Sequence, residues 1–579
     1  MSIPAAAEPP TPAVAARPDA AQSAVDGGQK APADEARGIW PWPLAIWLAV
    51  TATTLVARPP MVAADLPVHA VAWWAWMGRQ DIPYLPHAGA EWPPVLFWCI
   101  RLGWSLFGVG ETWARLAPSL FGLASLWLIV GLARRLWPDD KETPRYAPIV
   151  LAGSGGFIAF LATTVFAWPL LAASILALHG IVLAWRQRPV AGWAVYAVAL
   201  AFGELSAGAL AFWIMAPIAL AAPLAVRGFD AAALGRWYAG AVVATAVGLA
   251  ATAALELTPF AQPSAGADGD LLARLLLHGA LQSATLDQPW LWYVFVTTLL
   301  LFPWLWWTSL WWAVRRGHAQ FATAELRLCL TAAALIFLVV LIGGRQTGDL
   351  LPMLVPATLV VARIWATHAG KARDFHAAVP GLLALFVCLF FFMLNIVPVA
   401  HLDAVWQRLF ASDLPPWLGG ISLAAGITLL SGSYLLALLT PRTSFARLIQ
   451  MALLPVLLAL TVNLEFAVSL RPFFDVMPLA QQIRALAQTG PIAAYGRYDG
   501  QFDLAGRLEE PPVILHDTAA ALTWAEQNPS GVIVSFFRGG ILHLPEKPLY
   551  LGHAEDFRAA LWASAAVTAT HGAVLRPRF

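Results

Sequence analysis

The chain has 579 residues, of which 59% are hydrophobic and only 12% are charged, and its mean hydropathy is +0.67. So little charge over this length excludes a soluble globular protein and predicts an α-helical polytopic membrane protein. The formal net charge of +1 excludes a strongly basic surface, so no nucleic-acid partner is expected. Cys99, Cys329 and Cys388 stand singly in apolar runs and are interpreted as small core residues.

Residues 1–37 are rich in Ala, Pro, Asp and Gln and contain almost no large apolar side chain. Such a segment cannot bury enough surface to offset its chain entropy, so we expect a disordered cytoplasmic tail. It also lacks the short basic start and early apolar core of a cleavable signal peptide. The first apolar helix, expected over 40–57, is therefore predicted to be an uncleaved membrane anchor.

The apolar runs predict about thirteen transmembrane helices, because each is roughly as long as the 17 to 25 residues that cross a bilayer. They are expected at 40–57, 112–136, 147–164, 167–185, 190–204, 207–226, 237–257, 290–314, 323–343, 349–367, 377–399, 416–439 and 447–469.

Basic residues gather in alternate connections, as the pairs Arg134–Arg135 and Arg315–Arg316 illustrate. By the positive-inside rule, these connections and the N-terminus lie in the cytoplasm. The loops at 58–111 and 258–289 are then expected on the outer face. An odd number of spans also places the C-terminus outside.

The outer loop at 58–111 holds two acids, Asp65 and Glu91, among many Trp, Pro and Gly residues. An acid beside the membrane in apolar surroundings is a functional candidate, but Asp65 could equally cap the helix that follows it. Two amphipathic stretches of this loop predict interfacial helices, with Trp side chains at the headgroup level and Arg79 or Arg101 reaching lipid phosphates.

After residue 470 the composition changes, and short β-type runs (PIAAYG, PPVILH and GVIVSFF) alternate with amphipathic helical ones. This pattern is typical of a small α/β domain built from βα units. We therefore expect a small extracytoplasmic α/β domain over 471–579. The Gly pair after Arg538 is interpreted as structural, since it lacks a full phosphate-binding motif.

The outer loop and the helix after it resemble a known signature. Asp65 follows the first span, a Gly-x-Glu-x-Pro-Pro segment holds Glu91, and ARLAPSLFGLASLWLIVGLARRLW occupies 114–137. In this order and spacing the chain resembles the GT-C membrane glycosyltransferases, in particular the branch of aminoarabinose (lipid A) transferases and protein O-mannosyltransferases. The resemblance implies a GT-C-type transmembrane domain over 38–470.

The resemblance further implies a glycosyltransferase of the bacterial inner membrane, active in the modification of lipid A or another cell-envelope glycan. Such an enzyme moves a sugar from a polyprenyl-phosphate donor to a lipid, glycan or protein acceptor on the periplasmic face. Asp65 would be the general base or the acceptor-orienting group, and Glu91 would support acceptor or metal binding. His69, Arg79, His278 and Arg345 would bind substrate or the lipid phosphate. A need for a divalent cation such as Mg²⁺ or Mn²⁺ is left open.

Two alternatives stay open. One is a non-catalytic GT-C relative that binds polyprenyl phosphate or a partner enzyme. The other is a transporter, which would carry ionisable residues along a path near the bilayer midplane. Such residues are scarce in the predicted spans. Glu465 is the clearest case, and we interpret it as snorkelling toward the nearby outer surface.

Overall fold

The computed structural model carries side chains and describes most of the chain. The described residues are 40–61, 65–79, 82, 93–186, 188–256, 290–343, 347–368, 385, 389, 393, 396–410, 416–439, 441, 443–496, 498–537, 546–554 and 557–575. Residues Pro43–Phe579 belong to one compact unit. Glu91, His278 and Arg345 lie outside the described residues.

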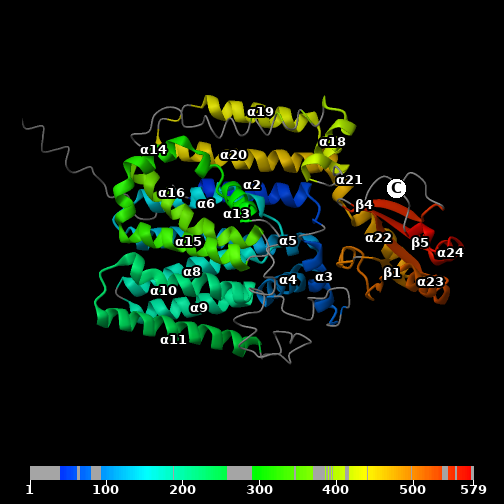
Figure 1. Ribbon diagram of the computed structural model, residues 1–579, viewed down its shortest axis with the longest axis horizontal. Helices are drawn as coiled ribbons and strands as arrows, with labels where there is room; N and C mark the ends of the chain where they lie inside the picture. The colour runs from blue at the N-terminus through cyan, green and yellow to red at the C-terminus, as the bar shows by residue number, and fades with distance from the viewer. Residues whose placement is uncertain are drawn as a thin grey trace, which may run out of the picture. The chain divides into compact units, whose positions relative to one another are not determined.

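Long apolar helices confirm a multi-pass membrane protein. Within the described ranges, eight helical segments are long and apolar enough to cross a membrane. Their helices are α5 (Glu111–Leu136), α8 (Ala167–Trp185), α9 (Pro189–Ala207), α10 (Ala209–Val226), α11 (Ala231–Glu256), α15 (Ala324–Gly343), α16 (Leu354–His368) after the 3₁₀ helix η4 (Thr347–Met353), and α20 (Ser444–Glu465). Helix α9 packs against α8, α10 and α11, which run beside it in Figure 1.

Shorter helices complete the helical part. The apolar ones are α2 (Pro41–Ala57), α4 (Pro94–Phe107), α13 (Trp290–Leu300) and α19 (Leu423–Leu438). The others are α3 (Leu66–Trp76), α6 (Glu142–Ala152), α7 (Gly155–Ala159), η2 (Trp304–Trp306), α14 (Thr308–Arg316), η3 (His318–Ala322), α18 (Val399–Phe410), η6 (Pro416–Gly420) and the π-helical η7 (Phe466–Leu470). The count of thirteen spans stays a prediction.

Two predicted spans are interrupted near their middle and are wrong as single helices. The run at 147–164 is divided between α6 and α7, and the run at 290–314 between α13, η2 and α14. The two interruptions touch each other, because the backbone N–H of Gly155 donates to the carbonyl of Phe302 at 2.7 Å. A Cβ at Gly155 would lie 2.5 Å from the carbonyl oxygen of Leu299, so only glycine permits this approach. Pro303, which has no N–H to donate, ends the helical hydrogen bonding on the other side.

The C-terminal residues form a five-stranded sheet. Figure 1 draws this sheet, with β1, β4 and β5 labelled, at the end of the chain. Its strands, β1 (Ile492–Tyr495), β2 (Val513–Leu515), β3 (Val532–Phe537), β4 (Tyr550–Ala554) and β5 (Phe557–Ala563), lie in the order β2-β1-β3-β5-β4. Strand β1 pairs in parallel with β2 and β3, while β5 is antiparallel to β3 and β4. The three predicted β-type runs are therefore confirmed as β1, β2 and β3. The helices are α21 (Arg471–Phe474), α22 (Met477–Ala487), α23 (Thr518–Gln527) and α24 (Ser564–Ala569), followed by η8 (Ala573–Leu575).

The two sides of the sheet contribute to different apolar cores. One core is local and joins the sheet to α23 and α24 through side chains such as Ala521, Trp562 and Val567. The other extends from β3, β5 and α22 to α3 and α4, and we call it the shared core. It holds, among others, Leu66, Trp73, Trp74, Leu96, Ile100, Trp104, Leu479, Ile483, Phe502, Leu504, Val534 and Leu561.

The shared core corrects the expectation that the tryptophans of the outer loop lie at the headgroup level. Trp74 and Trp104 are each only 1% exposed, and Trp73 is 7% exposed. These side chains are covered by protein because α3 and α4 pack on the C-terminal segment. Helix α3 is therefore positioned by protein contacts.

Glu465 is likewise different from the expectation. Its side chain is buried, and it accepts hydrogen bonds from the backbone N–H of Ser422 at 2.9 Å and from the hydroxyl of Ser469 at 2.7 Å. The snorkelling interpretation is wrong, since three donors, including the Ser422 hydroxyl, satisfy the carboxylate inside the protein.

Candidate active site

Asp65 lies between the end of α2 and the start of α3 and is fully buried. Its Oδ1 accepts the backbone N–H of Thr164 at 2.5 Å, and its Oδ2 accepts the backbone N–H of Met61 at 2.9 Å. The residue has helical backbone angles (φ −92°, ψ −44°), and its side chain makes no capping hydrogen bond to α3. The helix-cap interpretation is therefore wrong. The carboxylate connects two loops that lie far apart in the sequence.

His69 follows one helical turn later and is also fully buried. Its Nε2 lies 3.0 Å from the hydroxyl oxygen of Thr164, so one threonine contacts Asp65 through its backbone and His69 through its side chain. Burial lowers the pKa of His69 to about 4, although the carboxylate of Asp65 opposes this shift and Arg115 adds to it. The imidazole is therefore neutral at pH 7. Its Nδ1 has no hydrogen-bond partner within the part of the chain that the structure describes.

Arg115, in the first turns of α5, is 3% exposed. Its guanidinium group donates to three backbone carbonyls: Nη1 to Arg58 at 2.7 Å, Nε to Ala162 at 3.1 Å and Nη2 to Thr54 at 3.3 Å. These bonds connect α5 to the end of α2 and to the loop that contains Thr164. Arg115 thus holds together the two segments whose amides bind the carboxylate of Asp65.

Arg58 is the second cation of this region. Its Nη2 lies 3.4 Å from Oδ1 of Asn463, and its guanidinium stands over the ring of Phe466 at 5.1 Å. Burial, and then the charge of Arg115, lower the pKa of Arg58 to about 10, while Asp65 acts in the opposite direction. The side chain is therefore cationic at pH 7. Among the described residues, its Nε finds no acceptor.

The structure brings together only part of the predicted site. Asp65 and His69 share Thr164, whereas Arg79 is 44% exposed, lies 4.0 Å from Glu510 and stands over the ring of Trp74 at 5.9 Å. Among the described residues, Arg79 thus lies beside Glu510 and Trp74, and no hydrogen bond or ion pair joins it to Asp65 or His69. Glu91, His278 and Arg345 fall outside the described residues, so their roles stay predictions.

Three residues of this region were not predicted from the sequence: Arg58, Arg115 and Thr164. Arg115 did carry a signal, because a cation inside an apolar run is a functional candidate by default. Thr164 carries none, since its contribution is a backbone amide and a hydroxyl in an ordinary loop. The described residues contain no group of three or more His, Cys, Asp or Glu side chains that could hold a metal ion.

Comparisons with known proteins bear on the fold. A sequence model of the family "Dolichyl-phosphate-mannose-protein mannosyltransferase" matches residues 91–249. No curated protein matches the chain.

Two solved structures of ArnT from Cupriavidus metallidurans are similar to it over 90% of its length. The apo structure is 16% identical, with 97% of that chain covered and a TM-score of 0.63. The structure bound to undecaprenyl phosphate is 17% identical, with 96% covered and a TM-score of 0.64. The chain therefore has the fold of ArnT, and its expected resemblance to the GT-C membrane glycosyltransferases is confirmed.

Proposed function

We propose that the protein is a membrane glycosyltransferase that moves a sugar from a polyprenyl-phosphate carrier to an acceptor on the outer face of the inner membrane. In this proposal the N-terminus lies in the cytoplasm and the segment 471–579 in the periplasm. The acceptor is a lipid, a glycan or a protein. The observation that carries the proposal is the buried carboxylate of Asp65, fixed by two backbone amides from separate loops.

Asp65 is suited to act on an acceptor hydroxyl. A carboxylate has about four lone-pair sites, and two backbone amides occupy only part of them. The remaining sites can accept the hydroxyl proton of an acceptor, either to orient it or to remove the proton as the sugar is transferred. Because the two amides fix the carboxylate, it does not have to be ordered when substrate arrives.

Arg58 is suited to bind the lipid phosphate that leaves the sugar. When the bond between sugar and phosphate breaks, negative charge develops on the departing lipid phosphate, and a fixed cation nearby stabilises that charge. Arg58 is cationic, and its Nε donor has no acceptor among the described residues. We therefore propose Arg58 as a phosphate ligand, together with the predicted residues Arg79, His278 and Arg345. For His69, whose Nε2 faces Thr164, we propose contact with substrate through Nδ1.

The comparisons support a long-chain isoprenoid phosphate as the carrier. The family whose model matches residues 91–249 is named for a dolichyl-phosphate-linked sugar, and ArnT has been solved with undecaprenyl phosphate bound. Both molecules are polyprenyl-type phosphates. Glu91, which begins the matched segment, is proposed to assist Asp65 in binding the acceptor or a divalent cation.

The test is transfer of a labelled sugar from polyprenyl-phosphate donors by the purified protein. We expect Asp65→Asn to reduce kcat by about 10²- to 10⁴-fold, the range that general-base catalysis contributes. Asp517→Asn is the matched control. Asp517 caps α23 by accepting the backbone N–H of Ala520 at 2.7 Å, and Asn caps a helix equally well. Transfer that survives Asp65→Asn would exclude Asp65 as the base. Carrier binding without any transfer would instead favour a non-catalytic relative, and accumulation of a solute in sealed vesicles would favour a transporter.

A further inference from the structure

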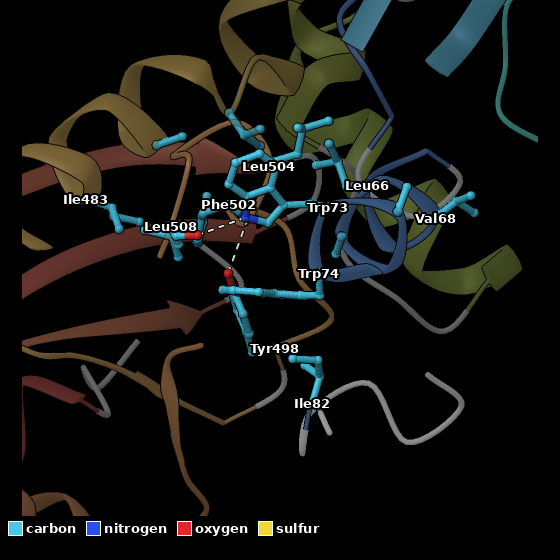
Figure 2. Packing of buried hydrophobic residues seen from close by; sticks show 14 of the residues in the cluster. Leu66, Val68, Trp73, Trp74, Ile82, Ile483, Tyr498, Phe502, Leu504 and Leu508 are labelled. Atoms are coloured by element: carbon cyan, nitrogen blue, oxygen red, sulfur yellow. Dashed lines mark hydrogen bonds between the residues drawn. The ribbon is translucent and has the colours of Figure 1, made fainter. Parts of the chain in front are cut away.

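Two neighbouring tryptophans of α3 donate hydrogen bonds to the segment between β1 and β2. Nε1 of Trp73 donates to the carbonyl of Leu508 at 2.8 Å, and Nε1 of Trp74 donates to Oδ2 of Asp503 at 2.7 Å. Figure 2 shows both indoles among side chains of this segment, including Tyr498, Phe502, Leu504 and Leu508. We call residues 498–508 the clamp segment. Since both indoles are buried, these bonds are shielded from water.

Asp503 is the centre of the clamp segment and is fully buried. While Oδ2 accepts from Trp74, Oδ1 accepts the hydroxyl of Tyr498 at 2.7 Å. The backbone carbonyl of Asp503 also accepts the N–H of Leu508 at 3.1 Å. A buried carboxylate is costly unless donors satisfy it, so the geometry of the segment and the position of Trp74 depend on each other.

Arg507 extends the clamp to the start of α5. Its Nη2 donates to the carbonyl of Val109 at 2.6 Å, and its guanidinium stands over the ring of Trp73 at 5.4 Å. Val109 lies two residues before α5, the helix that carries Arg115. The clamp segment therefore contacts both α3 and the residues just before α5.

Helix α3 is held at its two ends by different partners. At the start, Met61 and Thr164 bind Asp65, and Thr164 also contacts His69. At the other end, the clamp segment binds Trp73 and Trp74. Eleven residues make a helix about 16 Å long, so any tilt that follows the loss of contacts at one end would displace the other end. A displacement of about 1 Å at a reacting group is enough to reduce a rate about 10²-fold.

We propose that Asp503 is a positioning residue, which holds Trp74 and thereby fixes α3 in the orientation that presents the carboxylate of Asp65 to the acceptor. The inference rests on the proposed function, because its effect is on transfer. It assigns to the C-terminal segment a part in the reaction that requires no contact with substrate.

The test compares two Trp→Phe variants that each remove one buried indole donor. Trp74→Phe removes the donor to Asp503, while Trp562→Phe removes the donor to Ser535, at 2.9 Å in the local core. We expect Trp74→Phe to lower kcat at least about tenfold with KM for the lipid donor unchanged, because the substrate sites stay intact and the base is misplaced. Trp562→Phe should match wild type in kcat.

Asp503→Asn provides the second variant, since it keeps the shape of the side chain but can accept only one of the two bonds well. Its effect on kcat and that of Trp74→Phe should be less than additive in the double variant, because both changes weaken the same bond. A merely structural role would lower the melting temperature of both Trp→Phe variants alike and leave kcat per folded molecule unchanged, which would overturn the proposal.

Hydrogen exchange of the α3 amides separates this inference from the proposed function. Trp74→Phe should speed exchange in Leu66–Trp76 at least about tenfold, while Trp562→Phe should not. If the wild-type protein transfers no sugar, the proposed function fails, and the exchange rates alone decide whether Asp503 fixes α3. Unchanged α3 exchange in Trp74→Phe would overturn the proposal whatever the activity.

Discussion

At the scale of single residues, the candidate site depends on how Asp65 and His69 are paired. Both are fully buried, and both contact Thr164, which lies 99 residues after Asp65. Burial favours the neutral imidazole, whereas the carboxylate is supported by two backbone amides. The pair thus combines the carboxylate of Asp65, held by two hydrogen bonds, with the uncharged imidazole of His69.

The lowered pKa of His69 predicts how stability depends on pH. Between pH 6.5 and 4 the unfolded chain binds a proton at this histidine that the folded protein does not, so stability falls as the pH is lowered through this window. The largest change in the free energy of unfolding that this histidine can cause is on the order of 3 kcal/mol. His69→Gln removes the titrating group and should flatten the pH dependence of thermal unfolding in detergent over this range. A variant with the wild-type slope would assign that slope to another group.

At the scale of elements, α5 determines how the loops around Asp65 meet. It begins at Glu111, just after the carbonyl of Val109 that Arg507 contacts, and it carries Arg115 one turn later. Through Arg115 it binds the end of α2 and the loop before α8. One helix therefore connects two segments that hydropathy alone treats as separate.

The three carbonyl contacts predict that Arg115→Lys destabilises the protein although the charge is kept. A lysine ammonium lacks the planar fork and cannot reach all three carbonyls, and each lost bond to a charged donor costs about 1.5–3 kcal/mol. We expect the melting temperature of Arg115→Lys to lie below that of the wild-type protein. Arg447→Lys is the control, since Nε of Arg447 donates to one carbonyl, that of Pro441, at 3.2 Å. Equal losses in the two variants would contradict the role assigned to Arg115.

At the scale of the whole molecule, the shared core joins α3 and α4 to the C-terminal sheet. Leu66, Leu96 and Trp104 of α3 and α4 belong to the same buried cluster as Leu504 and Val534. Cooperative unfolding units follow buried apolar contacts, so α3 and this side of the sheet are expected to open together.

Leu504→Ala tests this coupling. Truncating a buried leucine costs about 2–5 kcal/mol, and the loss should speed hydrogen exchange in both α3 and β3. Leu575→Ala, at an equally buried leucine in the local core, should speed exchange in the sheet and leave α3 protected. If α3 responds equally to both substitutions, the two cores are not separate units.

The sequence by itself determined the class of the protein and many of its elements. Membrane helices follow from the length and hydropathy of each apolar run, and β1, β2 and β3 follow from short β-type runs between turn residues. These are local properties, so they can be inferred without knowing what each element contacts. The order of a few motifs around Asp65 and 114–137 was also enough to predict the fold that the ArnT structures confirm.

Only the tertiary structure decided what the polar and aromatic side chains do. The sequence around Asp65 allowed two interpretations. The structure excluded the helix cap, because the carboxylate accepts the amides of Met61 and Thr164 and makes no capping hydrogen bond to α3. Trp74 donates a hydrogen bond to Asp503 inside the protein instead of lying at the predicted membrane interface. Glu465 accepts hydrogen bonds from Ser422 and Ser469. Buried polar groups must find partners, and those partners come from whichever segments the fold brings close. Hydropathy predicts that a side chain will be buried, but which residues surround it depends on how the whole chain packs.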